Sequence, residues 1–113
     1  METYYKGDEI KFAVNLEASG FSMSDDDFEI EVKSGYTSVK GYKGASASEN
    51  SQDVVIFSET EGGETTWYVI VDTTSLAPGT MRVIATAHIV DANANDGVRN
   101  SIAVETLGKL IAP

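Results

Sequence analysis

The sequence predicts an all-β protein folded as a single antiparallel β-sandwich domain spanning residues 1–113. Three observations support this fold class. Apolar and polar residues alternate with a period of two in several segments, which is the pattern of half-buried strands. The three- and four-residue apolar spacing of an amphipathic helix is missing. A leucine followed by a Pro-Gly pair, within residues 76–79, predicts a chain reversal between two strands.

The N-terminal half predicts two strands, over residues 9–18 and 28–33. Each alternates apolar with largely polar side chains, so that one face of the strand is buried. The apolar positions are Ile10, Phe12, Val14, Leu16 and Ala18 in the first strand and Phe28, Ile30 and Val32 in the second. Residues 34–52 are rich in Gly and Ser and predict a long mobile connection, with a short strand near residues 38–42.

The C-terminal half predicts a hairpin and two further strands. Residues 53–59 and 65–73 form the hairpin, because Gly62 and Gly63 supply the positive φ that a tight turn needs. A strand over residues 81–90 follows, and a polar turn over residues 91–97 leads to a last strand. That strand includes Ile102 and Val104 and resumes at residues 107–111.

The corner between the hairpin and the next strand is formed by Leu76, Pro78 and Gly79. Proline fixes its own φ and glycine tolerates positive φ, so Leu76 can turn inward and plug the core. Several short strands joined by turns and by such a corner are typical of an immunoglobulin-like sandwich.

Composition narrows the possible functions. The chain has 18 acidic and 8 basic residues, a net charge of -10, which disfavours nucleic-acid binding. Lys33, Lys40 and Lys43 are interpreted as solvated loop charges. With no cysteine, a disulfide framework or thiolate metal site is excluded. We expect no membrane span and no signal peptide, since no long apolar run occurs and the first residues lack a cationic and then apolar segment.

No residue pattern predicts an enzyme, a metal or a cofactor. His88, the only histidine, has no nucleophile at a recognisable spacing. The acidic run at residues 25–27 is typical of a solvated turn. The segment that starts at Asp91 begins like a calcium loop, but Gly97 is one place late and Ile102 occupies the position of the bidentate glutamate. Trp67 lies on the same face of its predicted strand as Val69 and Val71 and is therefore expected in the core.

The predicted strands at residues 65–73 and 81–90 carry apolar groups on both faces, which predicts an additional contact surface. Its candidate residues are Tyr68, Ile70, Ile84 and Val90. A two-layer sandwich in water needs only one apolar face per strand, so these side chains need a cover. The connection at residues 34–52 is one possible cover, and a protein partner or a second copy of the chain is the other.

Three short segments resemble a known group of proteins. They are Gly7-Asp8 before the first strand, the corner from Leu76 to Gly79, and Asp96-Gly97-Val98-Arg99 after the polar turn. In this layout the chain resembles small β-sandwich proteins of Bacteroidales prophages and, more loosely, the N-terminal domain of upper baseplate proteins of phages of Gram-positive bacteria. The resemblance implies a virion or tail-assembly component without catalysis, located in the virion or in the bacterial cytoplasm before assembly.

The sequence therefore favours a non-catalytic structural or adaptor subunit of a phage tail or baseplate-like assembly. Such a subunit would act through protein–protein contacts, with a homo-oligomer as one option. The alternative is an immunoglobulin-like adhesion or carbohydrate-binding module of a bacterial surface protein, which the aromatic residues would suit.

Overall fold

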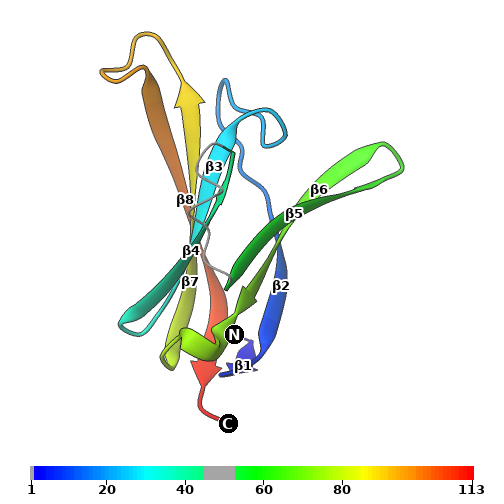
Figure 1. Ribbon diagram of the computed structural model, residues 1–113, viewed down its shortest axis with the longest axis vertical. Helices are drawn as coiled ribbons and strands as arrows, with labels where there is room; N and C mark the ends of the chain where they lie inside the picture. Colours follow the sequence, from blue (N-terminus) through cyan, green and yellow to red (C-terminus); the bar gives the residue numbers. More distant parts are fainter. Residues whose placement is uncertain (1, 45–52) are drawn as a thin grey trace.

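The computed structural model describes residues 2–44 and 53–113, which form two β-sheets packed face to face (Figure 1). The predicted all-β sandwich is confirmed. One sheet has five strands in the order β1-β8-β7-β3-β4, and the other has three in the order β2-β6-β5. The strands are β1 (Thr3–Tyr5), β2 (Glu9–Val14), β3 (Asp27–Ser34), β4 (Thr37–Lys43), β5 (Val54–Glu61), β6 (Glu64–Asp72), β7 (Gly79–Val90) and β8 (Val98–Ile111).

The strand pairs are antiparallel except for β1, which pairs with β8 in parallel. Thr3 lies opposite Lys109 and Tyr5 lies opposite Ile111. The sequence did not predict β1, because three residues are too few for a period-two pattern to be recognised. The prediction of a wholly antiparallel sandwich is corrected at this one short pair.

The hairpin of β5 and β6 forms as predicted. Glu61 lies opposite Glu64, and the two residues between them, Gly62 and Gly63, have φ of 61° and 84°. Positive φ at both central residues is the signature of the turn that matches the twist of the flanking strands. Figure 1 shows this hairpin projecting away from the other sheet at the end far from β1.

The prediction of a long connection over residues 34–52 is wrong in its first part. Residues up to Ser34 belong to β3, and β4 pairs with β3 from Thr37, opposite Ser34, to Lys43, opposite Phe28. Its inward positions are Val39 and Gly41. The short strand predicted near residues 38–42 lies within β4, and Gly41 on its buried face hid the wider alternation. The last part of the predicted connection, residues 45–52, lies outside the described residues.

Two further boundaries differ from the sequence prediction. β2 ends at Val14 instead of residue 18, although Leu16 beyond it is still buried. β8 is continuous where the sequence predicted an interruption. Its register shifts between Met81, opposite Gly108, and Arg82, opposite Thr106, so that Leu107 is an extra residue. An extra residue reverses the parity of the faces, which explains why the apolar alternation breaks there.

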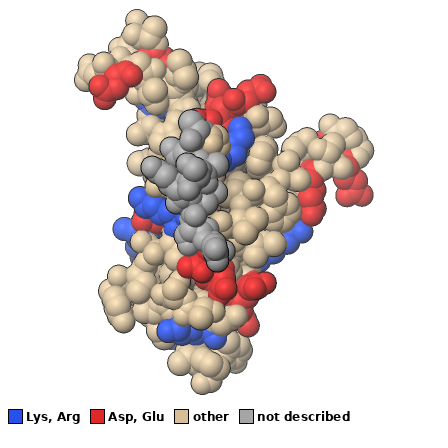
Figure 2. All heavy atoms as spheres, viewed as in Figure 1, with Lys and Arg blue, Asp and Glu red and all other residues tan. Residues whose placement is uncertain are grey.

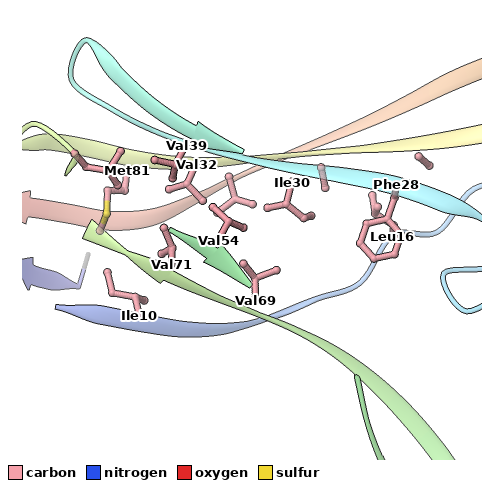
Figure 3. Packing of buried hydrophobic residues seen from close by; sticks show 14 of the residues in the cluster. Ile10, Leu16, Phe28, Ile30, Val32, Val39, Val54, Val69, Val71 and Met81 are labelled. Carbon is pink, nitrogen blue, oxygen red and sulfur yellow. The ribbon is translucent and has the colours of Figure 1, made fainter. Parts of the chain in front are cut away.

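The core lies between the two sheets (Figure 3). Phe28, Ile30 and Val32 of β3 point toward the three-stranded sheet, whose Val69 and Val71 point back. Each of these five side chains is 0 or 1% exposed. The central strand β7 adds its whole inner row, and the other members come from six more segments. The buried hydrophobic cluster is Ile10, Leu16, Phe28, Ile30, Val32, Val39, Val54, Val69, Val71, Leu76, Met81, Val83, Ala85, Ala87, Ile89 and Leu110.

The corner connects the two sheets between β6 and β7. A single 3₁₀ turn (η2, Thr73–Ser75) follows β6, and Leu76 after it has no exposed surface. The corner is fastened to the β3–β4 turn by hydrogen bonds: the Ser34 hydroxyl donates to the Ala77 carbonyl at 2.6 Å, and the Ala77 N–H donates to Thr37 Oγ1 at 2.8 Å. The buried backbone of Ala77 therefore has both of its polar groups satisfied.

Two glycines allow this close approach. Gly79 has φ of 151°, and a Cβ placed on it would lie 2.9 Å from the Gly35 nitrogen. A Cβ on Gly35 would in turn lie 2.9 Å from the Pro78 carbonyl oxygen. A side chain at either position would push the corner off the hairpin, so both must be glycine at this separation.

We predict that Leu76→Ala lowers the free energy of unfolding by about 2 to 4 kcal/mol, because it leaves a cavity in the closed end of the sandwich. Denaturant titration measures the loss. As a control, Tyr36→Ala at the exposed β3–β4 turn should change the free energy of unfolding by less than about 0.5 kcal/mol. A loss below about 1 kcal/mol for Leu76→Ala would contradict its role as the plug of the corner.

Candidate interaction surface

The four candidate contact residues lie on opposite outer faces of the sandwich. Tyr68 and Ile70 alternate with the buried residues of β6 and so face outward from the three-stranded sheet. Ile84 and Val90 face outward from the five-stranded sheet in the same way. The structure does not bring them together into one surface. The corner moves the chain from one sheet to the other between β6 and β7, which the apolar pattern of each strand could not reveal.

The Tyr68 side of the molecule is occupied by its own side chains. The rings of Phe57 and Tyr68 are stacked, with centroids 5.7 Å apart and planes at 25°. The Lys11 ammonium lies 4.4 Å from the Tyr68 centroid and 5.3 Å from that of Phe57, and it pairs with Glu59 at 3.3 Å. Such cation–π contacts stabilise the aromatic pair and cover it. This arrangement offers no open aromatic platform to a sugar.

The outer face of β7 and β8 has the larger exposed apolar surface. Val90 is 82% exposed, Ile102 64%, Val104 59% and Val98 43%. Val90 lies opposite Val98, and Ile84 lies opposite Val104, so they share one face of the sheet. We call Ile84, Val90, Val98, Ile102 and Val104 the β7–β8 strip. The sequence predicted only Ile84 and Val90 as contact residues, although the three β8 residues, all at even-numbered positions, carried the same alternating pattern.

Polar side chains interrupt the strip. His88 Nδ1 and Asn100 Oδ1 share a hydrogen bond of 2.9 Å across the two strands. His88 thus has a structural partner on the outer face of the sheet. The strip consists of one apolar pair beyond this hydrogen bond, at the loop end, and a larger apolar group before it.

The strip borders an open sheet edge. β1 pairs with β8 only at Lys109–Ile111, so in the described part of the chain the segment from Val98 to Thr106 has β7 as its single neighbour. An edge strand presents unpaired N–H and C=O groups to any strand that approaches it. The apolar strip and the open edge therefore lie side by side on β8.

Behind this edge lies a narrow cleft between the two sheets. Its volume is about 30 Å³, and it is lined by Phe12, Ala13, Val14, Asn15, Leu16, Val83, Ala85, Ala103 and Glu105. Such a space holds about two water molecules and is too small for a sugar or a nucleotide. The features of this region that could bind a partner are therefore the exposed β7–β8 strip and the open edge of β8.

The loop between β7 and β8 is held by an internal cation. The Asp91 carboxylate accepts hydrogen bonds from the Asn93 N–H and from Arg99 Nε, both at 3.0 Å. The Asn93 N–H and then Arg99 lower the pKa of Asp91 below its usual value. Arg99 also donates to the Ser19 carbonyl at 2.7 Å. Figure 2 shows acidic atoms at the two projecting ends of the molecule, of which this loop is one.

The other residues that were considered as sites from the sequence make contacts within the domain. Asp26 accepts a hydrogen bond from the Ser22 N–H at 2.8 Å, which closes a turn. Lys43 is not a loop charge as predicted, because it lies at the end of β4 and donates to the carbonyls of Ser24 and Asp26. Trp67 points inward and meets Phe28 edge-on, with centroids 5.6 Å apart. Among residues 2–44 and 53–113, no three His, Cys, Asp or Glu side chains are grouped to hold a metal ion.

Comparison with protein-family models, curated proteins and solved structures finds no match to this chain. Within its described residues, no helix has the length and apolar character needed to cross a membrane.

We predict that Asp91 stabilises the fold at neutral pH and not in acid. Its pKa is lower in the folded chain than the ordinary 3.8, so its contribution is complete above that value and is lost as the pH falls through the folded pKa. The difference in urea midpoint between the wild type and Asp91→Asn should therefore be constant near pH 7 and shrink below about pH 3.8.

Asp96→Asn is the control for this measurement, because it makes the same charge change in the same loop and leaves the Arg99 contact in place. A midpoint difference for Asp91→Asn that persists unchanged in acid would show that the carboxylate charge is not what stabilises the loop.

Proposed function

We propose that the protein is a non-catalytic structural or adaptor subunit that acts through protein–protein contacts made by the β7–β8 strip. One observation carries the proposal: four branched apolar side chains are exposed on one face next to an open strand edge. Large apolar side chains that gather exposed on one face, with polar groups beside them, are a feature of interaction sites.

Removing an exposed valine or isoleucine side chain from water contributes on the order of 1 to 2 kcal/mol. Val90 and Ile102, the most exposed members of the strip, would each contribute about this much when a partner covers them. A few such residues, with polar groups such as His88 and Asn100 among them, would form the apolar part of a protein interface.

The assembly that we propose is a phage tail or baseplate-like structure, with the protein in the virion or in the bacterial cytoplasm before assembly. This part of the proposal depends on the resemblance of three segments: Gly7-Asp8, the corner at Leu76 to Gly79, and the turn that ends at Arg99. In the structure these segments precede β2, join the two sheets and begin β8, respectively.

An immunoglobulin-like topology is part of the same proposal. The order β8-β7-β3-β4 facing β2-β6-β5 matches the G-F-C-C′ and B-E-D order of an immunoglobulin-type sandwich when β2 is taken as strand B. The carbohydrate-binding alternative receives less support, because Lys11 covers the stacked Phe57–Tyr68 pair.

The proposal predicts that the protein occurs in species heavier than the monomer in native extracts of the cells that produce it. Val104→Lys should shift it to the monomer, since burying an ammonium group in an interface costs several kcal/mol. Size-exclusion chromatography with antibody detection measures the distribution. Both the substituted and the original side chain at this exposed position are compatible with the fold, so melting temperature should change little.

Val55→Lys is the matched control. Val55 is 50% exposed, nearly as much as Val104, but lies on the outer face of the other sheet. This variant should remain in the heavy species. Equal behaviour of the two variants, or a wild type that is monomeric in the extract, would contradict the proposal.

A further inference from the structure

Along the open edge of β8, a positive and a negative residue lie at equal distances on either side of a central isoleucine. Arg99 and Glu105 lie three residues on either side of Ile102, and the residues between them are uncharged. All three lie in the segment that has no strand neighbour on its open side among the described residues. Arg99 and Glu105 point to the inner face of the sheet and Ile102 to the outer face, since they lie opposite Ile89, Val83 and Thr86 respectively.

Antiparallel pairing of two copies of β8 around Ile102 satisfies this pattern. Ile102 then lies opposite Ile102 of the second copy, and Arg99 lies opposite Glu105 of the second copy, twice by symmetry. Cross-strand pairs of opposite charge stabilise a sheet, and like charges in the same position destabilise it. A shift of the centre to Ser101 or Ala103 would remove both ion pairs and place each charge opposite an uncharged residue.

We propose that a second copy of this chain docks on the open edge of β8, in antiparallel register centred on Ile102. This inference depends on the proposed function, because it names the partner of the same surface. The pairing joins two five-stranded sheets into one and satisfies the edge N–H and C=O groups. It also continues the β7–β8 strip across the symmetry axis.

Arg99 is suited to this role. Its side chain is 41% exposed, and its bonds to Asp91 and Ser19 already hold the guanidinium in one orientation. A guanidinium has five N–H donors, so a contact to a second carboxylate is compatible with the bonds already made.

The net charge of -10 on each copy opposes association, and most strongly at low salt. The screening length is about 30 Å at 0.01 M salt and about 8 Å at 0.15 M. The edge itself is neutral between Arg99 and Glu105. Dimers should therefore be more stable at 0.15 M than at 0.01 M salt.

The first test is sedimentation equilibrium of the purified full-length chain at 0.15 M salt. We expect a concentration-dependent monomer–dimer equilibrium. Glu105→Arg replaces two attractive pairs by two repulsive ones and should weaken dimerisation about tenfold or more. Glu64→Arg, at the exposed hairpin end, changes the net charge by the same amount and should leave the dimer intact or slightly strengthen it.

The second test measures the register through a single thiol, because the wild-type chain has no cysteine. In the proposed dimer, Ile102→Cys lies directly opposite its counterpart, within reach of a disulfide. Val98→Cys is on the same face of the same strand but about 27 Å from its counterpart, eight residues away at about 3.4 Å each. Mild oxidation should cross-link the first variant rapidly and the second only at the rate of random collision.

Each outcome decides the proposal. A wild type that stays monomeric at several hundred micromolar overturns it, as does a dimer that tolerates Glu105→Arg or cross-links equally at both positions. If the purified chain is monomeric while Val104→Lys still abolishes the heavy species in extracts, the partner is a different protein and the proposed function stands. If extracts also show only monomer, both proposals fail.

Discussion

Between Asp72 and Gly79 the chain leaves the three-stranded sheet and enters the five-stranded sheet, and the packing at the closed end of the sandwich depends on how this passage is held. Leu76 fills the closed end of the sandwich, while Ser34 and Thr37 satisfy both backbone groups of Ala77. The passage also fixes β7 as the middle strand of its sheet, with neighbours on both sides. Its inner row can then be apolar throughout, because the opposite sheet covers it.

The two outer faces of the sandwich differ because a lysine lies over the aromatic side chains of the three-stranded sheet, whereas the apolar residues of β7 and β8 have no such cover among the described residues. On the three-stranded sheet, Lys11 spans the Phe57–Tyr68 pair and is itself neutralised by Glu59. On the five-stranded sheet, the side chains beside Val90 and Ile102 are short, as Thr86 is, or bonded to one another, as His88 is to Asn100. No long side chain lies over Val90, Ile102 or Val104, which are mostly exposed. The aromatic pair of the first face is covered within the domain, whereas the apolar side chains of the second remain exposed.

Much of the fold follows from the sequence, because alternation in strands such as β3 and the Gly62-Gly63 turn are local properties. β4 was predicted only as a short strand near residues 38–42 within a long connection, since Gly41 on its buried face carries no side chain to signal burial, and β1 was missed because it is very short. The interaction surface was identified only in part. Val90 could be singled out from one strand, but its relation to Val98 and its separation from Tyr68 depend on which strands pair, which is a non-local property.

Trp67 lies where the two sheets diverge, edge-on to Phe28 and with its indole N–H buried and without a hydrogen-bond partner among the described residues. It is the only tryptophan of the chain. One ring of the three-stranded sheet thus rests on one ring of the five-stranded sheet, and its indole senses a dry environment only while the sheets stay in contact. Tryptophan fluorescence of this protein should consequently report whether the two sheets are in contact. Far-ultraviolet circular dichroism, in contrast, reports the strands of each sheet whether or not the two sheets touch.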